Sequence, residues 1–139
     1  MGLISKKDGI ERIDTNIMVR LITRDDERLL KKARKLFSHE EKFYVVEDAA
    51  MMELVFVLSG AEYCYPRKKV AEKIKIVMQI PNLVCNKSII EGALDIYAGH
   101  PKLSFVDCYL AVMADTTQET PLWTFDHNLA MQCPVAREL

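Results

Sequence analysis

Near its start the chain contains the stretch Ile10-Glu11-Arg12-Ile13-Asp14-Thr15-Asn16. Residues 10–13 have the length and composition of a short strand, and the three residues after them carry side-chain oxygens suited to the beginning of a helix. We therefore predict a strand followed directly by a helix, with Asp14 at the junction between them.

The same alternation continues along the chain. Segments rich in β-branched and aromatic or other apolar residues predict further strands at residues 43–46, 83–85 and 122–125. Apolar residues at helical spacing predict helices over 25–37, 49–58, 66–81, 88–98 and 104–114. Ser88 and Glu91 would form a capping box at the start of one of them. This alternation predicts an α/β fold whose mostly parallel sheet is covered by helices on both faces.

Length and composition indicate one folded domain over residues 1–139. The chain has 139 residues, 50% of them hydrophobic and 28% charged, which suffices for a core but not for a second domain. Its longest apolar run, residues 108–114, is far shorter than the ~18 residues of a membrane-spanning helix. The four cysteines lack the spacing of a zinc site, which indicates a reducing compartment. We therefore expect a cytoplasmic protein with no membrane segment.

The formal net charge of -1 excludes a uniformly basic protein, but the charge is unevenly distributed. Residues 1–86 carry 16 basic and 13 acidic side chains, and residues 87–139 carry 3 and 7. Two basic stretches can contact RNA phosphates or can simply be solvated helix faces. They are residues 67–75 and the cluster Arg28, Lys31, Lys32, Arg34 and Lys35.

Four acidic residues stand at positions where acids are unusual. Glu53 and Asp107 are each the only charged residue in an apolar helical segment, where an unpaired carboxylate is costly. Asp14 and Asp126 each follow a predicted strand, and the carboxyl ends of parallel strands share one edge of a sheet. We therefore expect the four to converge. The alternative is that Asp14 and Asp126 only cap helices and that Ser104 and Asp107 only form a capping box.

A cluster of four carboxylates would repel itself unless it held a hard divalent cation such as Mg²⁺ or Mn²⁺. Ions of this kind can convert a water molecule into a nucleophile and neutralise charge on a phosphodiester. The pattern therefore predicts a metal-dependent enzyme acting on nucleic acid.

The order of these motifs resembles the PIN-domain family, and most closely its VapC-type toxins. The matching motifs are Asp14-Thr15-Asn16, Glu53 in its apolar helix, Ser-Phe-Val-Asp107 and Thr124-Phe125-Asp126, and the resemblance covers roughly residues 10–134.

The resemblance implies a three-layer α/β/α sandwich with a mostly parallel central sheet of four or five strands. It also implies a Mg²⁺- or Mn²⁺-dependent endoribonuclease whose catalytic and metal-binding residues are Asp14, Glu53, Asp107 and Asp126. Asn16 and Thr124 would orient these carboxylates or the metal-bound water. A homodimer inhibited by a small cognate antitoxin protein is implied as well.

Cys108 departs from the family pattern because relatives usually have alanine after the aspartate, so a thiol adjoins the predicted site. A phosphatase of the haloacid dehalogenase type would need Asp-x-Asp, but Asn16 occupies the third position. A receiver-like signalling module would need an acidic pair at the end of the first strand and a late lysine, and both are missing. The remaining alternative is an inactive PIN fold that serves as an RNA- or protein-binding scaffold.

Overall fold

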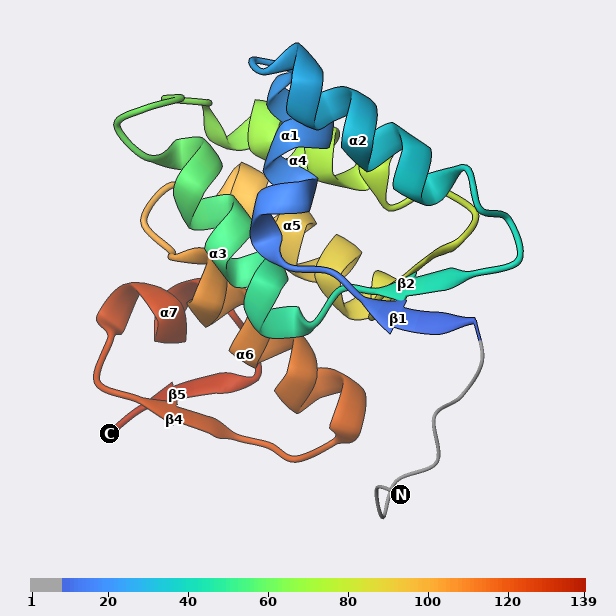
Figure 1. The fold of residues 1–139 in the computed structure, drawn as a ribbon. Helices are drawn as coiled ribbons and strands as arrows, with labels where there is room; N and C mark the ends of the chain where they lie inside the picture. The colour runs from blue at the N-terminus through green and yellow to red at the C-terminus, as the bar shows by residue number, and fades with distance from the viewer. Residues whose placement is uncertain (1–8) are drawn as a thin grey trace, which may run out of the picture.

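The computed structural model describes residues 9–139 (Figure 1). Within them, short parallel strands alternate with helices, so the α/β fold of the three-layer sandwich type is confirmed. The elements in chain order are β1 (Ile10–Arg12), α1 (Thr15–Thr23), α2 (Glu27–Phe37), β2 (Phe43–Val45), α3 (Asp48–Ser59), α4 (Arg67–Val77), β3 (Leu83–Val84), α5 (Lys87–Gly99), α6 (Phe105–Thr117), β4 (Leu122–Thr124), α7 (His127–Gln132) and β5 (Ala136–Glu138).

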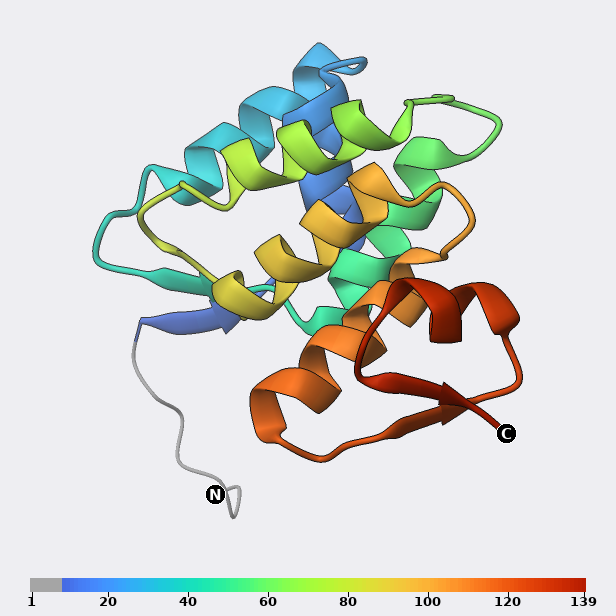
Figure 2. The same cartoon turned by 180° about the vertical axis from the view of Figure 1, so that it is seen from behind.

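The strands are divided between two sheets. The first has the order β1-β2-β3, and the second consists of β4 and β5. Figures 1 and 2 show α6 between the two sheets. Every strand pair is parallel, as expected for strands joined through helices, but β1 and β4 do not belong to one continuous sheet.

The core lies between the first sheet and the helices. Tyr44 and Leu83 are paired in register and both are buried on the inner face of this sheet. The Tyr44 ring meets Phe37 of α2 edge to face, and its hydroxyl donates to the Leu36 carbonyl at 3.0 Å. On the other face Ile10 and Phe43 are exposed, so the inner face carries most of the packing. Seen from behind, α4 and α5 lie across the molecule (Figure 2).

Side-chain caps begin several of the helices. The Asp26 side chain accepts from Leu29 N at 3.0 Å, and Ser104 accepts from Asp107 N at 3.1 Å. The expected capping box of Ser88 and Glu91 is wrong: α5 already begins at Lys87 and has no side-chain cap. Lys87 N donates instead to the Cys85 carbonyl, so the chain turns into the helix before Ser88 is reached.

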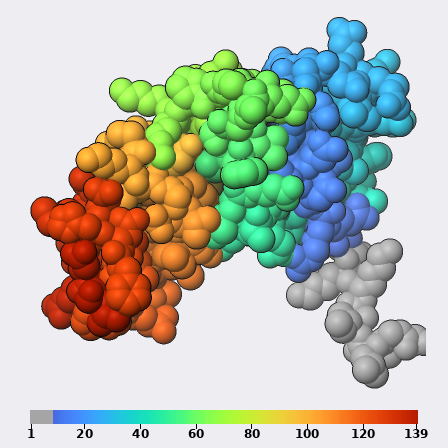
Figure 3. Space-filling model, turned by 90° about the vertical axis from the view of Figure 1, so that its left-hand side faces the viewer, coloured from blue at the N-terminus to red at the C-terminus, as the bar shows by residue number. Residues whose placement is uncertain are grey.

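The segment β4–α7–β5, residues 122–138, forms what we call the C-terminal unit. It occupies one end of the molecule, with β1, α1 and α2 at the other (Figure 3). Buried Leu129, Cys133 and Ala136 join it to the core. None of the helices in residues 9–139 is long and apolar enough to cross a membrane.

Candidate active site

Asp14 lies directly after β1 and caps α1. Its side-chain oxygen Oδ1 accepts a hydrogen bond from Asn16 N at 3.1 Å, and both side chains are exposed. The capping interpretation is therefore confirmed for this residue. Capping does not exclude a further role, because a carboxylate has two oxygens and about four acceptor positions.

Glu53 is exposed, so the expectation that apolar residues enclose it is wrong. Its sequence neighbours are apolar, but α3 directs Met51, Leu54 and Leu58 inward, whereas Glu53 and Phe56 lie on the outer side. Phe56, one turn further on, is 78% exposed. The carboxylate therefore needs no buried cation to balance it, and it is accessible to a ligand.

Thr15 links α1 to Glu53. Its buried hydroxyl lies 3.1 Å from Glu53 Oε2 and 3.2 Å from the Ala50 carbonyl, and it can donate its proton to either. Because Thr15 follows Asp14 directly, this contact holds the two acidic segments together. The sequence motif contained Thr15, but no role was predicted for it.

Asp14 and Glu53 line one open cleft of about 770 Å³, which we call the carboxylate cleft. Glu47 and Arg12 also line it and form an ion pair with each other. Neither residue was predicted from the sequence to belong to the site. Glu47 follows the strand segment 43–46 just as Asp14 follows 10–13, so the same positional rule would have found it.

Asp107 lies in the first turn of α6 and is half-buried. Burial raises the pKa of the Cys133 thiol, and the negative charge of Asp107 raises it further. Burial also raises the pKa of Cys108 to about 12, with the neighbouring Cys133 adding to the shift. Since the reactive form of cysteine is the thiolate, Cys108 is a poorly reactive thiol beside Asp107.

Asp126 and Thr124 belong to the C-terminal unit. Asp126 caps α7 by accepting from Leu129 N at 3.1 Å, and its own backbone N–H donates to Thr124 Oγ1 at 2.9 Å. Asp126 is exposed. The helix-capping interpretation is therefore confirmed here as well.

The four acidic residues do not form one cluster. In residues 9–139 no three His, Cys, Asp or Glu side chains are grouped so that they could hold a metal ion. β1 and β4 lie in different sheets, so the shared sheet edge on which Asp14 and Asp126 were expected to meet is not present. The Asp14 and Glu53 pair nevertheless fits Mg²⁺ in donor type and number, since proteins often bind this ion through one or two carboxylates plus water and substrate phosphate.

Arg67 does not face water as the sequence pattern suggested. Its Nη1 donates to the carbonyls of Tyr97, His100 and Leu103 at 3.0, 3.1 and 2.6 Å. Its guanidinium also lies over the Tyr97 ring, 4.2 Å from the centroid. Arg67 thus holds the connection between α5 and α6, which leads directly to Ser104 and Asp107.

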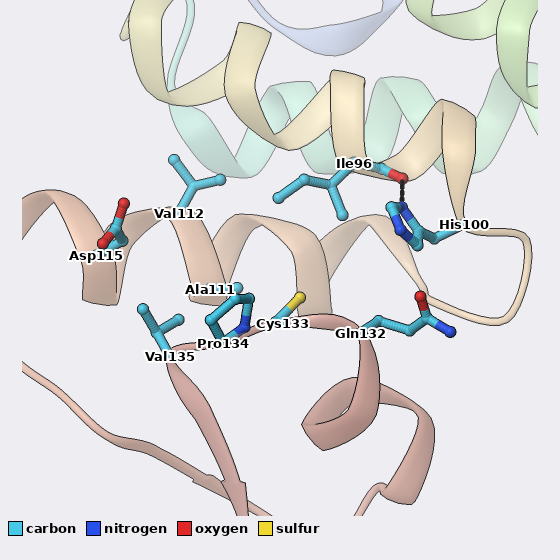
Figure 4. Close-up of a pocket in the computed structure, with 9 residues that line it drawn as sticks. All are labelled: Ile96, His100, Ala111, Val112, Asp115, Gln132, Cys133, Pro134 and Val135. Carbon is cyan, nitrogen blue, oxygen red and sulfur yellow. Dashed lines mark hydrogen bonds between the residues drawn. The ribbon is translucent and has the colours of Figure 1, made fainter.

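A separate cavity of about 280 Å³ lies between α5, α6 and the segment that joins α7 to β5 (Figure 4). Ile96, Val112 and Val135 give it a mainly apolar lining. At one side the His100 ring nitrogen Nδ1 donates to the Ile96 carbonyl at 2.9 Å. None of the predicted site residues lines this cavity, so it is distinct from the carboxylate cleft.

Comparison with known families identifies the class of protein. The sequence profile of the PIN domain matches residues 13–132, a range that contains all four predicted acidic residues. The chain therefore belongs to the PIN-domain family, whose members are typically metal-dependent ribonucleases and generally bind Mg²⁺ or Mn²⁺. No curated protein and no solved structure matches the chain.

Proposed function

We propose that this protein is a Mg²⁺- or Mn²⁺-dependent endoribonuclease that hydrolyses RNA phosphodiester bonds. The observation that carries the proposal is the meeting of Asp14 and Glu53 in one solvent-open cleft, inside the region that matches the PIN domain. Asp107 and Asp126 lie outside this cleft and stay in the proposal as further acidic residues, with Asn16 and Thr124 as supporting residues.

The residues of the cleft have separable roles in this proposal. Asp14 and Glu53 would hold the metal ion, which supplies an activated water and neutralises charge on the phosphodiester. The Thr15 hydroxyl orients Glu53 through Oε2, and the Asn16 backbone orients Asp14 through Oδ1. The ion pair with Glu47 holds the Arg12 guanidinium at the cleft, where it can meet an RNA phosphate.

The resemblance to VapC-type toxins supports a finer proposal. In it the protein is a homodimeric toxin of the cytoplasm that a cognate antitoxin protein inhibits. Controlled expression of the wild type and of Asp14→Asn in a bacterial host tests the toxin role. Growth arrest by the wild type alone is the expected result, and equal growth of both strains would contradict it.

The main alternative is a PIN fold that has lost catalysis and serves as a scaffold. All four acidic residues are retained, and Glu53 is exposed in an open cleft instead of being sequestered. These two observations favour the enzyme.

The decisive experiment is cleavage of a mixed RNA pool by purified protein with Mg²⁺ or Mn²⁺, with EDTA as the metal-free control. Asp14→Asn tests the cleft, and Glu72→Gln on the exposed side of α4 is a matched loss of one negative charge elsewhere. We expect cutting by the wild type and by Glu72→Gln, and none by Asp14→Asn or with EDTA. Unchanged cutting by Asp14→Asn would overturn the assignment of the site.

A further inference from the structure

The exposed side of α2 carries a row of positive charge. Its members are one helical turn apart, at positions i, i+3, i+4 and i+7, so they lie on one face over about 10 Å. All four are exposed, and none forms an ion pair with a carboxylate in residues 9–139. We call this row the basic stripe; it consists of Arg28, Lys31, Lys32 and Lys35.

The basic stripe adjoins the carboxylate cleft. A groove of about 360 Å³ between α1 and α2 is lined by Lys32 together with Asp14 and Asn16. This groove and the carboxylate cleft share Asp14, Ile17 and Leu36, so they form one continuous surface. Lys32 is therefore the member of the stripe that stands at the entrance to the site.

The second basic helix, α4, differs because three of its five cations have partners within the protein. Arg67 donates to three backbone carbonyls, and Lys75 forms an ion pair with Asp95. The ammonium group of Lys69 lies 4.0 Å from the centroid of the Tyr65 ring. Two helices that look alike in sequence thus differ in how much positive charge they offer to a ligand.

We propose that the sugar–phosphate backbone of single-stranded RNA lies along the basic stripe and enters the α1–α2 groove beside Lys32, which leads it to Asp14. This inference rests on the proposed ribonuclease function and assigns its substrate path to α2. An acidic protein would also be attracted to positive charge, but protein interfaces are depleted of lysine at their core. None of the large apolar side chains exposed in residues 9–139 lies on α2, so the stripe also lacks an apolar anchor for such a partner.

The test measures RNA binding without cleavage. Binding of a short fluorescein-labelled single-stranded RNA of mixed sequence is followed by anisotropy in EDTA over a range of NaCl concentrations. The triple variant Lys31→Gln/Lys32→Gln/Lys35→Gln is compared with the charge-matched variant Lys68→Gln/Lys73→Gln/Lys75→Gln on α4. Thermal melting of both variants checks that they are folded.

Each phosphate contact contributes about −0.7 to the slope of log K against log salt concentration for a single strand, so loss of three contacts reduces the magnitude of the slope by about 2. We expect this change, with at least about tenfold weaker binding at low salt, for the α2 variant and little change for the α4 variant. Equal losses in the two variants would overturn the proposed path. Unchanged RNA binding by the α2 variant would also overturn it, and an acidic protein would then be the remaining ligand for the basic stripe.

Failure of this inference can be distinguished from failure of the proposed function. If the α2 variant binds RNA normally while Asp14→Asn abolishes cutting, the RNA path is wrong and the ribonuclease assignment stands. If the wild type cuts no RNA but only the α2 variant loses binding, the path stands and the ribonuclease assignment is wrong.

Discussion

The region β1–α1–α3 and the C-terminal unit both present acidic residues at the start of a helix or on its outer face. The two regions differ in how tightly the side chains around these acidic residues are packed. Beneath the carboxylate cleft, Met18, Met51 and Leu54 are completely buried. The C-terminal unit instead leaves large apolar side chains in solvent, with Trp123 57%, Phe125 80% and Met131 70% exposed. The first region is a densely packed frame, whereas the second is a small unit joined to the core by a few residues.

This difference has a consequence for catalysis. A reactive group works best when packing and hydrogen bonds from surrounding residues fix its position. Glu53 and Asp14 have such support from Thr15 and the start of α1, whereas the hydrogen bonds of Asp126 with Thr124 and Leu129 lie within its own short unit. We therefore expect the cleft residues to contribute more to activity than Asp126.

The largest expected effect is on the rate of RNA cleavage by variants of the carboxylate cleft. Glu53→Gln and Asp14→Asn should each lower the rate of RNA cleavage on the order of 10²–10³-fold, because each removes a charged group that stabilises the reaction electrostatically. Asp126→Asn should cost about tenfold or less. Initial rates at saturating Mn²⁺ check the ranking, and an equal loss for Asp126→Asn would show that the C-terminal unit contributes as strongly as the cleft.

Stability serves as the control for these variants. Because Glu53 is exposed, Glu53→Gln should change the free energy of unfolding by no more than about 0.5 kcal/mol. Isothermal titration with Mn²⁺ should show binding lost in this variant and retained in Glu72→Gln. Normal Mn²⁺ binding by Glu53→Gln would remove Glu53 from the proposed metal site.

The second effect concerns the connection between α5 and α6, which Arg67 holds. Arg67→Ala removes the side-chain donor that the carbonyls of Tyr97, His100 and Leu103 share, and it removes the contact with the Tyr97 ring. We expect a loss of about 2–3 kcal/mol in the free energy of unfolding, measured by urea denaturation. Lys68→Ala, its exposed neighbour on α4, should cost less than about 0.5 kcal/mol. Similar losses in the two variants would contradict the role assigned to Arg67.

The sequence predicts local features of this protein better than the placement of its side chains. Asp14 as a helix cap and Ser104 before α6 follow from hydrogen bonding within a few residues, which a sequence pattern contains. The exposure of Glu53 depends on which side of α3 meets the core, and an apolar helix with no polar face gives no periodicity from which to read it.

Long-range contacts were the part that the sequence could not supply. Arg67 lies in a row of basic residues, yet its partners are carbonyls 30 to 36 positions further along the chain. Likewise, the rule that parallel strands share an edge holds within each sheet, and nothing local shows that β1 and β4 lie in different sheets.

A smaller effect is expected at the contact between α3 and α6. The Tyr109 hydroxyl donates to Asp48 Oδ2 at 2.5 Å and so links the helix that carries Glu53 to the helix that carries Asp107. Tyr109→Phe should lower the free energy of unfolding by about 1 kcal/mol, since the pair is only half-buried. Asp48→Asn keeps an acceptor oxygen and should cost less. Urea denaturation of both variants checks this, and the reverse order would show that the hydroxyl contributes little.

The smallest effect lies in the turn between α1 and α2, at the edge of the packed region. Asp25 accepts hydrogen bonds from Tyr63, Thr23 and Arg20, each at 2.8 Å, and these hold its pKa at about 2, below its ordinary 3.8. Because the pKa is lowered by folding, this contribution to stability is present above about pH 4 and is lost as the pH falls towards 2. Asp25→Asn should therefore slightly lower the melting temperature at neutral pH and flatten its decline between pH 4 and pH 2, so that the variant and the wild type converge near pH 2. Since Asp25 is solvent-exposed, the difference should also shrink as salt is added, and an unchanged acid profile would show that these hydrogen bonds do not persist in solution.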